Sequence, residues 1–168
     1  TCASAFDALT AASFQVASII TTTGFSTVDF NTWPELSKTI LILLMFCGAC
    51  AGSTGGGIKV SRIVIVIKNL RKELHSYIHP KSVRKIKFEG KPVDHDVVRS
   101  INVYFTTFIV IFVISVILVS LEGYDFTTNF TAVLAAFNNI GPGLSLVGPT
   151  CNFGFFNPLT KYVLMFDM

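Results

Sequence analysis

The chain is poor in charge. Only 14% of its 168 residues are Asp, Glu, Lys or Arg, whereas 51% are hydrophobic and sixteen are Phe. A soluble domain of this length usually carries about 25% charged residues, so the deficit indicates that lipid is the main solvent. Residues 101–121 contain no ionisable group apart from Tyr104. At about 1.5 Å per residue they cover the roughly 30 Å hydrocarbon core, so we expect a membrane-spanning helix there.

The chain also lacks the residue patterns of a metal site. Cys47 and Cys50 have the spacing of a zinc or redox pair, but they lie in an apolar run without a second such pair or a nearby His. We expect both to act as small packing residues. His75, His79 and His95 lie in a basic segment, where solvated positions are expected. We therefore expect no transition metal, no cofactor and no enzymatic activity.

Positive charge is concentrated in one part of the chain. Eleven of the thirteen Lys and Arg residues fall between Lys59 and Arg99, against four acidic residues. A nucleic-acid patch is the alternative interpretation, but aromatics are sparse there and apolar spans bound the segment on both sides. The positive-inside bias favours a cytoplasmic loop over residues 69–99, with no nucleic-acid partner. Lys59 and Arg62 are then expected to extend toward the cytoplasmic headgroups.

Apolar segments and breaks divide the rest of the chain. Residues 4–20 and 127–138 are predicted to be helices too short to span the membrane, and each is followed by a polar turn with Gly. Residues 36–67 form a long apolar segment that a run of Gly, Ser and Thr interrupts. We expect an all-α membrane protein with three regions, residues 1–68, 69–99 and 100–168.

An internal repeat relates the two short helices. Phe30-Asn31 and Phe156-Asn157 each precede a Lys and an apolar run, and Gly24 pairs with Gly141 at an offset of 117. Each unit reads as a short helix, a polar turn, an extracellular linker and an inner helix. Backbone that enters and leaves the membrane on one side must be buried in protein or face water. Two such segments imply a shared aqueous axis.

The turns after the short helices have the chemistry of a cation site. They are uncharged, offer carbonyl and hydroxyl oxygens, and follow helix ends that carry roughly half a negative charge. Such oxygens replace the hydration shell of a cation in selectivity filters, whereas ordinary interfacial turns are the alternative. The candidate filter residues, which would hold potassium, are Thr21, Thr22, Thr23, Gly24, Phe25, Asn138, Asn139, Ile140, Gly141 and Pro142.

The glycine-rich run has three interpretations. It begins with the spacing of a phosphate-binding loop, but Lys59 is displaced by one position and no Ser or Thr follows it directly. Glycines four apart suit helix packing, but three successive Gly carry a large helix penalty, about 1 kcal/mol each. We favour a break that lines the cavity and obstructs or opens an ion path. Its residues are Gly52, Ser53, Thr54, Gly55, Gly56 and Gly57, with Lys59.

Three stretches carry a resemblance to a known family. SIITTTGFS (residues 18–26), GACAGSTGGGIKVSR (residues 48–62) and FNNIGPGLS (residues 137–145) resemble the TrkH/KtrB/HKT superfamily of potassium transporters, most closely its bacterial TrkH branch. The resemblance covers essentially the whole chain. It implies repeated outer helix, pore helix and inner helix units around one pore, as in a potassium channel. This chain would hold the third and fourth of four units, each in part.

The resemblance also implies a function. It implies potassium uptake across the bacterial inner membrane by a multi-pass protein, with the filter mouth outside and the Gly52 to Gly57 region as an intramembrane gate. Gly24 and Gly141 agree with potassium preference; sodium or mixed monovalent transport, and a nucleotide-binding membrane component that uses Gly52 to Lys59, are the alternatives. The implied partners are the lipid bilayer, a second copy in a homodimer and a cytosolic ring of nucleotide-binding regulatory subunits.

Overall fold

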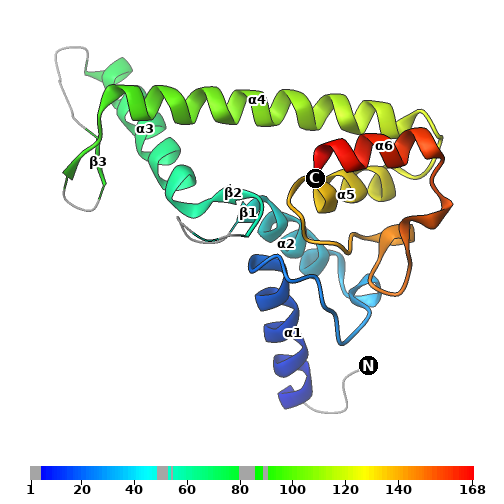
Figure 1. Ribbon diagram of the computed structural model, residues 1–168. Helices are drawn as coiled ribbons and strands as arrows, with labels where there is room; N and C mark the ends of the chain where they lie inside the picture. Colours follow the sequence, from blue (N-terminus) through cyan, green and yellow to red (C-terminus); the bar gives the residue numbers. More distant parts are fainter. Residues whose placement is uncertain (1–4, 49–52, 54, 80–85, 89–90) are drawn as a thin grey trace.

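The structure is a computed structural model that describes residues 5–48, 53, 55–79, 86–88 and 91–168. The helices α2 (Glu35–Phe46), α4 (His95–Ser120) and α6 (Pro158–Asp167) pack around the short helix α5 (Phe126–Phe137). The long helix α4 extends from there to α3 (Val60–Ile78), at the far end of the molecule (Figure 1). The expected all-α fold is confirmed. The strands of the described residues form two pairs with two residues in each strand.

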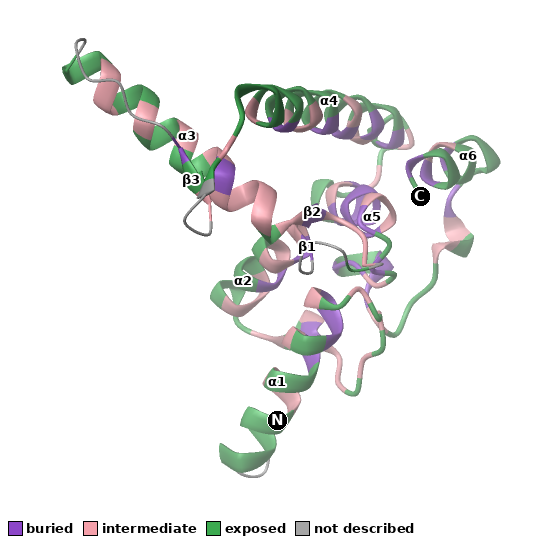
Figure 2. Cartoon of the chain, turned by 60° about the vertical axis from the view of Figure 1, so that its left-hand side comes forward, coloured by how far each residue is buried: buried purple, intermediate pink, exposed green. Residues whose placement is uncertain are grey.

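The helix α5 is the centre of the core. Its residues Ala132, Val133 and Leu134 are fully buried, and Figure 2 shows most of the helix in the buried class. It packs against α2 (Glu35–Phe46), α4, α6 (Pro158–Asp167) and the 3-10 turn η2 (Ser145–Val147). The alternation of Ala with Val and Leu lets these neighbours approach closely. Asp125 begins the helix, because its carboxylate accepts a hydrogen bond from the amide of Thr127 at 3.2 Å.

From Ile101 onward, the helix α4 carries no charged residue on any side. Within the described residues it is the one helix whose length and composition suffice to cross a membrane, and its 26 residues extend about 39 Å. Its buried stripe follows helical spacing and consists of Ile101, Phe108, Phe112, Ser115 and Val119. The outward face is also apolar, with Ile109, Val113 and Ile117 about half exposed. A water-facing helix would carry polar residues there, so this face is suited to lipid.

Phenylalanines join α2, α4 and α5. The ring of Phe112 lies edge-on to Phe46 of α2 at 5.7 Å and to Phe130 of α5 at 5.3 Å. One turn away, Phe108 meets Phe137 edge-on at 4.6 Å. Such pairs add about 0.5–1.5 kcal/mol each beyond the area that they bury. The high Phe content therefore serves packing between helices.

The helix α1 (Ala5–Ile20) lies apart from this core except at its C-terminal end. Its buried residues are Gln15, Ser18 and Ile19, and it packs against α2. The chain then turns through η1 (Phe30–Thr32), where Phe30 is fully buried. The short helices expected over residues 4–20 and 127–138 are present as α1 and α5; Ser4 lies outside the described residues. At 16 and 12 residues, both are shorter than a membrane span.

The break within residues 36–67 is longer than the run from Gly52 to Gly57 that the sequence shows. The helix α2 ends at Phe46, and the two-residue strands β1 (Cys47–Gly48) and β2 (Ile58–Lys59) pair in parallel. The helix therefore ends before the glycine run begins at Gly52. A Cβ at Gly48 would meet the carbonyl oxygen of Gly56, so the return of the chain against itself requires glycine.

Helix replaces much of the predicted basic loop. The helix α3 (Val60–Ile78) continues past residue 69, and α4 begins at His95, before residue 99. Between them, the strands β3 (Lys87–Phe88) and β4 (Lys91–Pro92) form an antiparallel pair. The pattern SRIVIVIKNLRKELHSYI is amphipathic at helical spacing, and its Lys and Arg residues do not interrupt a helix, since both are good helix formers.

A polar contact joins α4 to α6 inside the apolar core. The hydroxyl of Ser115 donates to Oδ1 of Asp167 at 2.7 Å, and both side chains are buried. Replacement of one partner leaves the other buried and unsatisfied, which costs more than the bond itself contributes. The contact therefore fixes the position of α6 along α4.

We expect Ser115→Ala to destabilise the intact parent protein by about 1–3 kcal/mol, because the Asp167 carboxyl loses its hydroxyl donor. Thermal unfolding in detergent measures this. Ser120→Ala, at an exposed position of the same helix, is the matched control and should have little effect. Equal stability of the two variants would contradict the prediction.

Candidate functional site

The two short helices end in the same backbone motif. After α1, the amide of Thr22 donates to the carbonyl of Ile19 at 3.1 Å, and the amide of Thr23 donates to that of Ser18 at 2.9 Å. Bonds of this spacing, with a left-handed residue between helix and turn, define the Schellman ending. Thr22 takes that left-handed conformation with φ of 54°. A β-branched residue rarely does so, and the cost is of order 1–3 kcal/mol.

The end of α5 repeats this geometry 117 residues later. The amide of Asn139 donates to Ala136 at 3.0 Å, and the amide of Ile140 donates to Ala135 at 2.9 Å. Asn139 is left-handed, with φ of 52°. The repeat predicted from sequence therefore extends to the hydrogen bonds of individual residues.

Both turns alternate in backbone hand. Thr22 and Gly24 have φ of 54° and 78°, and Asn139 and Gly141 have φ of 52° and 106°, whereas the residue between each pair has negative φ. Alternation of hand turns successive peptide planes so that neighbouring carbonyls face the same side. A row of carbonyl oxygens on one side of the chain is the arrangement that coordinates dehydrated cations in filters.

The two turns lie against each other. A Cβ at Gly24 would overlap the carbonyl oxygen of Ile140 and would lie 3.5 Å from the Pro142 ring. Glycine at position 24 is therefore required twice, by its positive φ and by this contact. Beside them lies a cavity of about 590 Å³ that α5 and α6 also line. The filter candidates that line it are Thr22, Thr23, Asn139, Ile140 and Gly141.

Hydroxyl groups hold the first turn in place. Ser18 donates to the carbonyl of Phe25 at 2.6 Å, and Thr21 donates to the carbonyl of Ala17 at 2.7 Å. The hydroxyls of Thr21 and Thr23 lie 2.8 Å apart. Thr21 thus braces the turn from α1, and the Phe25 side chain is 71% exposed and does not line the cavity.

A second brace crosses between the repeats. The side chain of Asn31 donates to the carbonyl of Ser145 at 3.2 Å and accepts from the amide of Ser145 at 2.9 Å. Behind the second turn, Thr131 accepts from the amide of Leu144 at 3.0 Å. We did not predict Asn31 or Thr131 as site residues. The repeated Phe-Asn pair was a sequence signal for Asn31; Thr131, inside a helix, gave none.

Gly56 and Gly57 of the glycine-rich segment lie against both turns. The amide of Gly56 donates to the Thr22 hydroxyl at 3.4 Å, and a Cβ at Gly56 would overlap the carbonyl of Asn138. A Cβ at Gly57, which has φ of 74°, would lie 2.9 Å from Oδ1 of Asn138. Asn138 is fully buried and therefore faces this segment instead of the cavity. Gly52 and Thr54 lie outside the described residues.

Lys59 is turned back into its own segment. Its ammonium donates to the carbonyl of Ser53 at 2.9 Å, to the Ser53 hydroxyl at 3.1 Å and to the carbonyl of Gly55. The expectation that it extends to the headgroups is therefore wrong. Arg62 instead stacks over the Tyr104 ring, 4.2 Å from its centroid. Since the three donors of Lys59 are engaged, this geometry does not favour a phosphate-binding loop.

Comparison with known proteins places these features in one family. The family model TrkH, described as a cation transport protein, matches residues 3–168. The Trk system potassium uptake proteins TrkH of Vibrio parahaemolyticus and Salmonella typhimurium are 39% and 36% identical over 165 residues, which is 98% of this chain. The chain spans about a third of the length of these curated relatives, 34% in each case.

A solved structure has the same fold. The crystal structure of the potassium transporter TrkH from Vibrio parahaemolyticus superposes with a TM-score of 0.89 at 38% identity. The match covers 99% of this chain and 35% of that protein.

We expect Gly24→Ala to weaken cation binding by the intact parent protein at least tenfold. The new Cβ would overlap the Ile140 carbonyl, and alanine is strained at the positive φ of this position. Gly123→Ala is a matched control, since Gly123 has φ of 79° and nothing within 4 Å of an added Cβ. The stabilisation of each variant by potassium chloride against thermal unfolding measures binding. Equal loss of binding in both variants would contradict the prediction, because Gly123 does not contact the second turn.

Proposed function

The chain belongs to the TrkH family of cation transport proteins, and from that premise we propose that it supplies two of four filter strands for potassium uptake by the intact protein. The observation that carries this proposal is the pair of turns with the same alternating backbone hand, at Thr22 to Gly24 and at Asn139 to Gly141. Two strands enclose only part of an ion path, so conduction belongs to the longer protein.

The proposed conduction step is an exchange of ligands. A potassium ion that enters from outside loses water and binds the carbonyls of the two turns, with the Thr22 and Thr23 hydroxyls nearby. The C-terminal ends of α1 and α5, which carry partial negative charge, each lead directly into one of the two turns. These partial charges favour a cation, and the absence of a full negative charge at the turns lets the ion leave again. No covalent chemistry is required.

The proposed gate is the glycine-rich segment below the filter. Its position against Thr22 and Asn138 supports an obstruction on the inner side of the ion path. Lys59 would hold the segment there through the carbonyls of Ser53 and Gly55 and would add a positive charge below the filter. Opening of the ion path then requires the hydrogen bonds of Lys59 to these carbonyls to break.

The proposed orientation and partners follow from charge. The concentration of Lys and Arg between Lys59 and Arg99 supports a cytoplasmic position for residues 69–99 and an outer position for the filter mouth. The same basic region offers a surface for a cytosolic nucleotide-binding ring, and the relatives are named as parts of a Trk system. A homodimer of the intact protein completes the proposal.

Ion flux through the intact parent protein in liposomes tests conduction. We expect Gly24→Asp and Gly141→Asp each to reduce rubidium uptake about tenfold or more, because a carboxylate in the filter binds the ion and narrows the path. Gly123→Asp, at an open turn, is the control. Unchanged uptake in both filter variants would refute the proposal. Competition by sodium equal to that by potassium would favour the mixed-cation alternative.

The gate has its own test. We expect Lys59→Met to raise resting uptake several-fold, because the ammonium no longer ties the glycine segment beneath the filter. Lys68→Met removes the same charge from α3, where the ammonium bonds the carbonyl of Lys87 at 2.8 Å instead. Flux through this control should stay unchanged. A decrease or no change in Lys59→Met would indicate that the segment only packs the helices.

A further inference from the structure

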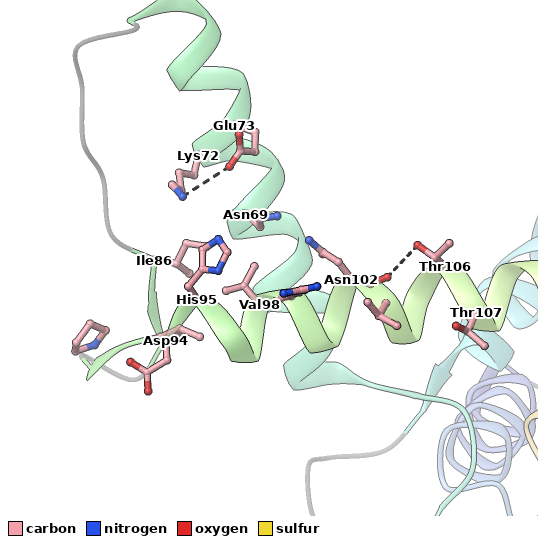
Figure 3. Close-up of a pocket in the computed structure, with 14 residues that line it drawn as sticks. Asn69, Lys72, Glu73, Ile86, Asp94, His95, Val98, Asn102, Thr106 and Thr107 are labelled. Carbon is pink, nitrogen blue, oxygen red and sulfur yellow. Dashed lines mark hydrogen bonds and ion pairs between the residues drawn. The ribbon is translucent and has the colours of Figure 1, made fainter.

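A second cavity lies at the other end of α4, away from the filter. It has a volume of about 840 Å³ and opens between α3 and α4, beside the β3–β4 pair (Figure 3). Neither the filter nor the glycine segment contributes to its wall. The polar and charged residues that line it are Asn69, Lys72, Glu73, Asp94, His95, Arg99, Asn102, Thr106 and Thr107.

The wall of this cavity changes character along α4. His95 and Arg99 come before the uncharged apolar span that begins at Ile101, whereas Val103 and Thr107 lie within it. Arg99 and Thr107 are eight residues apart, about 12 Å along the helix. The cavity therefore spans the change from charged to uncharged residues along α4, where we expect lipid headgroups to give way to acyl chains.

The charged groups divide into compensated and uncompensated ones. Lys72 and Glu73 form a loose pair at 3.7 Å, which Figure 3 shows at the α3 wall. Asp94 lies just ahead of α4, and its carboxylate points away from Asn69 and Asn102 (Figure 3). Within the part of the chain that the structure describes, Arg99 has neither an ion pair nor a hydrogen bond through its side chain. Its guanidinium can therefore offer several donors to an anion.

An apolar stripe leaves the cavity along the outer face of α4. Val103, Thr107, Val110, Ile114 and Ile117 follow each other at helical spacing, and all are exposed. The stripe continues over about 21 Å, which suits an extended acyl chain. A soluble acidic peptide or a free phosphate would use the charged end but not this stripe.

We propose that the cavity between α3 and α4 binds the phosphate of an anionic membrane phospholipid, with Arg99 as its cationic contact and an acyl chain along the Val103 to Ile117 stripe. A guanidinium suits a phosphate diester because its planar donors match two phosphate oxygens. The inference rests on the membrane location of the family and is independent of the conduction proposal.

Native mass spectrometry of the intact parent protein in detergent tests the site. Phosphatidylglycerol and phosphatidylcholine are titrated against the protein and against Arg99→Gln. We expect the variant to bind phosphatidylglycerol about fivefold more weakly. Phosphatidylcholine, whose choline cation neutralises its phosphate, should bind weakly to both forms. Arg71→Gln removes an exposed guanidinium from α3 outside the cavity and should bind as the unmodified protein does.

A second variant separates lipid from other anions. Val103→Trp fills the groove with all charges intact and should also weaken phosphatidylglycerol binding. Displacement of the lipid by millimolar inorganic phosphate would assign the site to a soluble anion and overturn the proposal. Equal lipid binding by all variants would overturn it as well. So would an Arg99→Gln variant that binds lipid normally and loses only the binding of a cytosolic protein. Thermal unfolding without added lipid verifies that the variants are folded.

Discussion

Backbone that is neither helix nor strand needs hydrogen-bond partners where water is absent, and the rest of this structure depends on that constraint. A helix satisfies its own amides and carbonyls, but each turn and break gives up some of those bonds, and lipid offers no replacement. Side-chain hydroxyls and amides replace part of them here, as Ser18 does at the first turn, Thr131 at the second and Asn31 between the two. Lys59 does the same for the glycine segment. Hydroxyl and amide side chains therefore gather where the helices stop.

The repeat keeps the backbone while it changes the side chains. The last hydrogen bonds of α1 and α5 agree residue by residue at an offset of 117. The left-handed position is Thr22 in one unit and Asn139 in the other, and only Asn enters that conformation readily. The additional hydroxyl contacts of the first unit, through Ser18 and Thr21, agree with its greater backbone strain. One backbone form is thus reached through two sets of supports.

Much of this was predictable from the sequence, and the rest failed for local reasons. The short helices, the long span and the pairing of Gly24 with Gly141 followed from hydrophobic length and from the repeat. The early end of α2 at Phe46 did not, because the strand pair of Cys47 with Ile58 depends on a contact across the break. Apolar periodicity continues through Cys47 and gives no sign of it. The orientation of Lys59 was missed because its carbonyl partners belong to a turn whose path the sequence does not specify.

One residue links the first turn to the glycine-rich segment. Thr22 lines the cavity beside the two turns, and its hydroxyl accepts a hydrogen bond from the amide of Gly56. Substitution of either residue therefore changes two regions at once, and the free-energy effects at positions 22 and 56 should not add. The residue at one position then affects which residues the other position tolerates. If the proposed function holds, ion preference and gating share this constraint, although 34 positions of sequence separate Thr22 from Gly56.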